Sequence, residues 1–191
     1  MSAPITNGSM KTTIDSMEVG DYIANTYTTT AMTALGTLGS FGTAGTAELS
    51  STNLSAATVY FTKIDIGLLI CNFPIMSGAT YKTVNALNLI AGKKITIDGK
   101  DFIMRVPTTA ELNLANSTLD GMLDTNNRYA NFNTAASVSE MIQENYNLTG
   151  GYYQWNNTPG STSNYASGDT ARNVRIVLEY VDNAKSTDVF H

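Results

Sequence analysis

The chain has 191 residues and a mass of 20.5 kDa, which suits one domain or a tight pair of domains with a sizeable core. Its net charge is −5 at pH 7, only 14% of its residues are charged, and Thr, Ser and Asn together supply 61 residues. This acidic balance excludes a nucleic-acid binder with a basic face, and the single Cys71 and single His191 exclude a disulfide scaffold and a zinc site of several soft ligands.

Three regions are expected from composition. The composition predicts a polar N-terminal arm at residues 1–15, a single domain over residues 16–182 and a C-terminal tail at residues 183–191. The start has neither the basic nor the apolar region of a secretory signal, so we expect synthesis in a host cytoplasm. The longest apolar run, at 66–71, is far shorter than the roughly 20 residues that span a bilayer, so we expect no membrane insertion.

The first half of the domain predicts strands around one long loop. A short strand is expected over residues 17–24, and residues 26–57 are so rich in Thr, Ala, Gly and Ser that they indicate a loop. Regular structure is expected to resume at Thr58, and β-branched and aromatic residues predict a strand over 59–66. A second, buried strand is expected at 68–71, after a break at Gly67.

Three local patterns follow in the middle of the chain. Near-helical spacing predicts a short helix over Tyr81–Ile90. Alternating apolar residues over Lys93–Val106 predict a β-hairpin, because Asp98-Gly99 at its centre suits a tight type I′ turn. Thr108 and Glu111 form a capping box after Pro107, which predicts a helix that continues to about Asn116.

The last third of the chain repeats one of these signals. Ser137 and Glu140 form a second capping box, which predicts a second helix with an inner stripe of Val138, Met141, Ile142 and Tyr146. The tract from 150 to 173 is irregular by composition. The apolar segment 174–181 predicts a closing strand.

No residue is a strong candidate for catalysis. A nucleophilic site of the Ser-His-Asp or Cys-His kind needs a histidine held beside the nucleophile, and the single histidine is the last residue. Cys71 lies in an apolar strand and predicts an unreactive core residue. We therefore expect no enzyme and no cofactor. A hydrolase that acts on cell-wall glycan through two carboxylates remains an alternative.

The irregular tract has the composition of an adaptable recognition surface, since Tyr and Trp give large contacts and Asn, Ser and Gly adapt their hydrogen bonds. Its candidate ligand-binding residues are Tyr152, Tyr153, Trp155, Asn156, Asn157, Tyr165 and Asp169. The alternative is that Tyr152, Tyr153 and Trp155 pack inward and that the rest forms turns.

Hard oxygen ligands in the same region raise the question of calcium. Asp169, Asn156, Asn157 and Glu179 offer such ligands, but no EF-hand loop is present. The preferred interpretation is that these Asn and Asp residues form turns, so no metal site is predicted.

Three stretches resemble a known family. Phe102-Ile-Met-Arg-Val-Pro-Thr-Thr-Ala-Glu-Leu resembles the strand–R-[LV]-P-T–helix element of the formylglycine-generating-enzyme-like branch of the C-type-lectin-like fold. Arg172-Asn-Val-Arg-Ile-Val-Leu-Glu-Tyr lies where that fold has its final strand. The opening from Met10 to Ile23, the Thr/Gly-rich loop and Gly92-Lys-Lys-Ile-Thr-Ile-Asp-Gly-Lys are similar to clostridial-type phage and prophage structural proteins.

The chain departs from this family at positions that bear on activity. Asn173-Val174 replaces the usual Gly-Phe before the last Arg, and the Trp-rich centre is reduced to Trp155. The enzyme branch needs cysteines near its C-terminal part, where this chain has none, so inherited catalysis is not expected. The calcium-lectin motifs Glu-Pro-Asn and Trp-Asn-Asp are absent as well.

The resemblance implies an α+β domain of C-type-lectin-like fold, with two short helices on a twisted antiparallel sheet and long loops. It implies a non-enzymatic virion structural protein, exposed on the particle as a capsid decoration protein; the alternative is a tail-tip or fibre adhesin. The implied partners are other virion proteins, sister subunits in a homo-oligomer, and a cell-surface glycan or protein. Nucleic acid is not among them.

Overall fold

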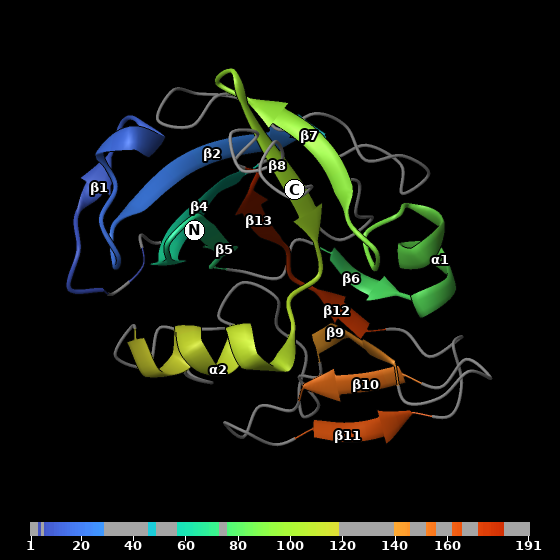
Figure 1. The fold of residues 1–191 in the computed structure, drawn as a ribbon. Helices are drawn as coiled ribbons and strands as arrows, with labels where there is room; N and C mark the ends of the chain where they lie inside the picture. The colour runs from blue at the N-terminus through green and yellow to red at the C-terminus, as the bar shows by residue number, and fades with distance from the viewer. Residues whose placement is uncertain are drawn as a thin grey trace, which may run out of the picture.

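The computed structural model describes residues 4, 6–28, 46–48, 57–72, 76–118, 140–145, 152–155, 162–165 and 172–181, and these form an α+β fold (Figure 1). The strands are β1 (Met10–Lys11), β2 (Tyr22–Thr28), β3 (Thr46–Glu48), β4 (Ala57–Asp65), β5 (Leu68–Cys71), β6 (Met76–Ala79), β7 (Lys93–Ile97), β8 (Lys100–Arg105), β9 (Glu140–Asn145), β10 (Tyr152–Trp155), β11 (Thr162–Tyr165), β12 (Arg172–Val174) and β13 (Val177–Tyr180). The helices are the 3₁₀ turn η1 (Ile14–Ser16), α1 (Tyr81–Ala86) and α2 (Thr109–Thr118).

The strands form two sheets. The larger has eight strands in the order β1-β2-β4-β5-β13-β8-β7, with β3 beside β2, and its neighbours are antiparallel except that β1 and β3 run parallel to β2. The smaller has five strands in the order β11-β10-β9-β12-β6, and its β9–β12 pair is parallel. Figure 1 shows the smaller sheet below the larger one, with α2 beside it.

Two connections between the sheets lie next to each other: the one from β5 to β6 and the one from β12 to β13. β5 belongs to the larger sheet and β6 to the smaller, and β12 and β13 return in the opposite direction. At the crossing, the amide of Cys71 donates to the carbonyl of Ile176 at 2.9 Å, and Arg175 Nη1 donates to the carbonyl of Cys71 at 2.6 Å. The predicted closing strand is therefore two strands, separated by the fully buried Arg175 and Ile176.

Side chains on the two faces of the larger sheet enter different cores, as the alternation of a strand requires. One face carries the main cluster, in which Phe61, Phe102, Met104 and Leu178 pack with residues around α1 and η1. The other face lies under α2, whose Leu112 and Ala115 form a second cluster with Ile64, Ile70 and Val177. Cys71 is fully buried in the main cluster, which confirms the core cysteine.

One predicted helix is wrong. The capping box at Ser137 and Glu140 predicts a helix, but Glu140–Asn145 is strand β9, which pairs with β10 on one side and β12 on the other. Pairing between strands distant in sequence outweighs this weak local signal. The predicted long loop also contains the end of β2 and all of β3.

The β7–β8 hairpin confirms its prediction in detail. Asp98 and Gly99 adopt φ values of 51° and 75°, which a type I′ turn requires and which glycine tolerates without strain. The register places Ile95 opposite Phe102, so both alternating apolar sets enter the main core.

The turn gives a direct test of this local specification. We predict that Gly99→Ala lowers the free energy of unfolding by about 1 kcal/mol, because a Cβ at positive φ is strained while the space around it is open. Asp98→Gly is the control, since it keeps the backbone conformation and is expected to change stability little. Urea denaturation at equilibrium measures both, and equal stabilities of wild type and Gly99→Ala would contradict the prediction.

Candidate functional site

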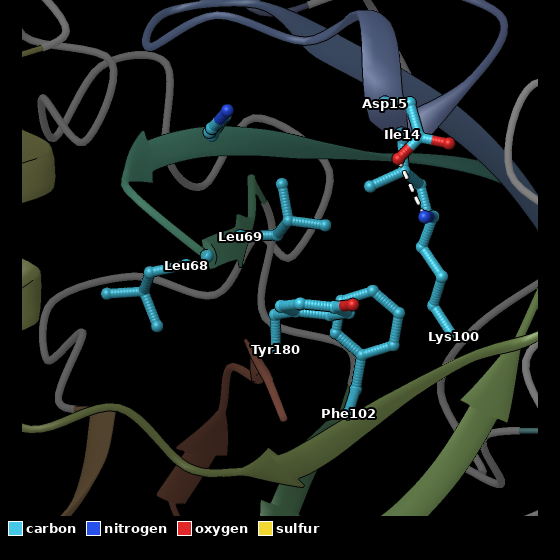
Figure 2. A pocket seen from close by; sticks show the side chains of 9 residues that line it. Ile14, Asp15, Leu68, Leu69, Lys100, Phe102 and Tyr180 are labelled. Atoms are coloured by element: carbon cyan, nitrogen blue, oxygen red, sulfur yellow. Dashed lines mark ion pairs between the residues drawn. The ribbon is translucent and has the colours of Figure 1, made fainter. Parts of the chain in front are cut away.

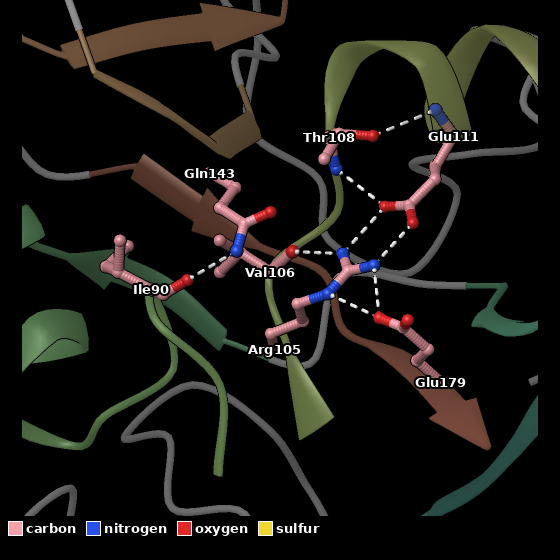
Figure 3. Close-up of polar contacts among 7 residues, drawn as sticks. All are labelled: Ile90, Arg105, Val106, Thr108, Glu111, Gln143 and Glu179. Atoms are coloured by element: carbon pink, nitrogen blue, oxygen red, sulfur yellow. Dashed lines mark hydrogen bonds and ion pairs between the residues drawn. The ribbon is translucent and has the colours of Figure 1, made fainter. Parts of the chain in front are cut away.

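The R-V-P-T element that the sequence singles out forms a network around Arg105, whose side chain is only 9% exposed. Its Nη2 and Nη1 donate to the two carboxylate oxygens of Glu111 on α2, at 2.6 and 2.8 Å (Figure 3). Its Nε and Nη2 donate to one oxygen of Glu179 on β13, at 3.2 and 2.9 Å. One guanidinium therefore joins β8, α2 and β13.

Glu111 also caps α2, as the sequence predicts. The amide of Thr108 donates to Glu111 Oε2 at 2.8 Å, and the amide of Glu111 donates to Thr108 Oγ1 at 3.2 Å. Burial alone raises the pKa of Glu111, but hydrogen bonds from Arg105 and Thr108 outweigh it and hold this pKa below its usual value. The same pairing raises the pKa of Arg105.

The link between β8 and α2 also holds the smaller sheet. The amide of Gln143 on β9 donates to the carbonyl of Pro107 at 2.9 Å, and its side-chain Nε2 donates to the carbonyl of Ile90 at 2.9 Å. The amide of Val106 donates to the carbonyl of Leu89 at 2.9 Å. Because all three guanidinium nitrogens of Arg105 contact protein oxygens, this network fits a structural junction better than a reactive centre.

The junction predicts a pH-dependent loss of stability. The folded-state pKa of Glu111 lies below the usual 4.5, so the stability it contributes is present above that pH and is lost as the pH falls through the folded-state pKa. We predict that Glu111→Gln lowers the free energy of unfolding by about 1–2 kcal/mol at pH 7, and that the difference shrinks below pH 4.5.

Glu179→Gln is the matched control, because Glu179 contacts the same arginine. Its side chain is 54% exposed, and it lies on strand β13, where it caps no helix. Its effect is expected to stay below about 1 kcal/mol. Urea titrations of the three proteins across pH 3–7 measure these differences. A pH-independent deficit in Glu111→Gln would contradict the assignment.

The predicted recognition tract is only partly described. Tyr152, Tyr153 and Trp155 lie on β10 and Tyr165 lies on β11, two antiparallel strands at the edge of the smaller sheet that place Tyr152 opposite Tyr165. Asn156, Asn157 and Asp169 lie outside the described residues. The structure therefore places the backbones of these four aromatic residues on two adjacent strands. The role of their side chains stays a prediction.

Of the four oxygen ligands considered for calcium, only Glu179 has a described side chain, and it pairs with Arg105. Across the described ranges, no group of three or more His, Cys, Asp or Glu side chains is placed to hold a metal ion. None of the helices in these ranges is long and apolar enough to cross a membrane.

A hollow that the sequence does not predict lies on the main-core face of the larger sheet, beside η1, with a volume of about 230 Å³ (Figure 2). Its apolar wall includes Leu68, Leu69 and Phe102. Charged and polar groups complete it: Asp15, Lys63, Lys100 and Tyr180. Lys100 Nζ pairs with Asp15 Oδ1 at 2.6 Å, and both residues line the hollow.

Asp21 fixes the segment around η1 that forms one wall of this hollow. It is 5% exposed and accepts hydrogen bonds from the amides of Ser9 and Glu18, at 2.8 and 2.9 Å. Although burial raises the pKa of Asp21, these bonds and Lys11 lower it overall. Residues 9–18, part of which we expect in the arm, are thereby tied to the sheet.

Comparison with known proteins gives no relative. No family model, curated protein or solved structure matches this chain.

Proposed function

We propose that this protein is a non-enzymatic structural protein of a phage virion, exposed on the particle as a capsid decoration protein in many copies. We propose further that its α+β fold is C-type-lectin-like, of the formylglycine-generating-enzyme-like branch. The proposal starts from the resemblance of residues 10–180 to phage structural proteins of clostridial type.

One observation carries the proposal furthest. The two stretches that resemble the family, the R-V-P-T element and the closing segment, are neighbours in space as β8 and β13, with Met104 opposite Leu178. Arg105 and Glu179, one from each stretch, form an ion pair at 2.9 Å. Contact between the two resembling stretches supports one shared structural element rather than separate chance similarities.

The outer strands support an exposed role. β11 ends the strand order of the smaller sheet, and β10 and β11 carry a segment rich in Tyr, Asn, Ser and Thr. Such a segment suits contacts with sister subunits or with a cell-surface glycan. Many copies on one particle would let weak individual contacts act together.

Particles of the phage that encodes this chain provide the test. We expect mass spectrometry of purified virions to detect the chain in many copies, and cryo-electron microscopy to place its density on the outer capsid surface. Particles from which the gene is deleted serve as the control for that density. Absence of the chain from purified virions would refute the proposal.

A tail-tip adhesin is the second candidate, favoured by the aromatic residues of β10 and β11. In that case the density lies at the tail tip, and Trp155→Ala and Tyr165→Ala reduce adsorption to host cells at least tenfold. Lys94→Gln, in the exposed face of the β7–β8 hairpin, is the control for adsorption. Unchanged adsorption of both aromatic variants would exclude this function for the β10–β11 strands.

A further inference from the structure

The hollow beside Tyr180 combines an apolar wall with two ammonium groups. Leu69 and Phe102 are almost fully buried and close its inner side, while Tyr180 is 42% exposed at its mouth. The rings of Phe102 and Tyr180 meet edge to face with centroids 5.7 Å apart. A volume of about 230 Å³ is below the 300–1,000 Å³ typical of drug-sized sites, so it suits a single ring with a short chain.

The cations that line the hollow bear on the charge of any ligand that it could bind. Lys63 Nζ donates to the carbonyl of Met17 at 2.6 Å, a neutral acceptor that leaves its charge able to attract an anion. Lys100 Nζ lies 6.0 Å from the centroid of the Tyr180 ring and pairs with Asp15. Two lysines on an apolar hollow, in a chain of net charge −5, favour an anionic ligand.

Asp15 already supplies a carboxylate to Lys100, and its exposure makes it replaceable. Its side chain is 77% exposed on the three-residue turn η1, whereas that of Lys100 is 27% exposed. An ion pair of this exposure contributes little to stability, so another carboxylate can take its place on Lys100 at small cost. Figure 2 shows Lys100 reaching from β8 to Asp15 beside the Tyr180 ring.

We propose that this hollow is a binding site for a small aromatic carboxylate, whose ring packs on Leu69, Phe102 and Tyr180 and whose carboxylate replaces Asp15 on Lys100. Asp15 then acts as an internal competitor. The site is independent of the proposed virion role and is tested on the isolated 191-residue chain, so failure of one proposal leaves the other standing.

The test is a titration of the ¹⁵N-labelled protein with 3-phenylpropionate, followed by amide chemical shifts. We expect saturable shifts at the amides of Gly67, Leu69, Phe102 and Tyr180, and at least threefold weaker binding of the uncharged 3-phenylpropan-1-ol. Absence of shifts at these amides, or equal binding of the alcohol, would overturn the proposal.

Two variants with opposite expected effects separate this site from non-specific binding. Asp15→Asn removes the competitor and is expected to tighten binding about two- to fivefold. Lys100→Gln removes the cation and is expected to weaken binding at least threefold. Lys94→Gln is the matched control, because Lys94 also forms an ion pair on the same hairpin but does not line the hollow.

The spectrum of each variant shows directly whether it is folded. If Lys100→Gln fails to fold, Asp15→Asn alone decides, since it leaves the sheet intact. Unchanged or weaker binding to Asp15→Asn would refute the role of Lys100 as the carboxylate partner.

Discussion

The buried guanidinium of Arg105 is the constraint on which the arrangement of β8, α2 and β13 depends. A charge withdrawn from water must find acceptors, and Arg105 finds them on Glu111, six residues along the chain, and on Glu179, 74 residues away. Glu111 accepts hydrogen bonds from both the Arg105 guanidinium and the amide of Thr108 at the start of α2. Rotation of the helix would therefore break both sets of hydrogen bonds. Gln143 then fixes β9, and with it the smaller sheet, to the same junction.

The features of this fold that can be predicted from the sequence are those formed by interactions between residues close together in the chain. The Asp98-Gly99 turn and the Thr108–Glu111 cap are each completed within a few residues, and both are present as predicted. An equally good capping signal at Ser137 is misleading, because β9 pairs with β10 and β12 and its Gln143 amide donates to the carbonyl of Pro107. No local pattern reports such distant pairing, nor the break of the closing strand at Arg175.

The candidate sites also combine features formed by neighbouring residues, which the sequence predicts, with contacts between distant segments, which it does not. The R-V-P-T pattern is visible in the sequence, but its chemistry depends on Glu179, which lies 74 residues from Arg105. The hollow could not be predicted at all, because η1, β4, β5, β8 and β13 meet there only through the strand order of the larger sheet. Lys100 and Asp15 are ordinary surface residues by sequence, and only this meeting brings them into an ion pair.

The position of β13 has a consequence for how the molecule forms during synthesis. Residues 177–180 lie between β5 and β8, near the middle of the larger sheet, yet they are translated after all the other strands that the structure describes. Until they leave the ribosome, β5 and β8 each lack a hydrogen-bonding neighbour, and Arg105 lacks Glu179. The nascent chain therefore carries two unpaired strand edges, which invite pairing with other chains until β13 has been synthesised and lies between them.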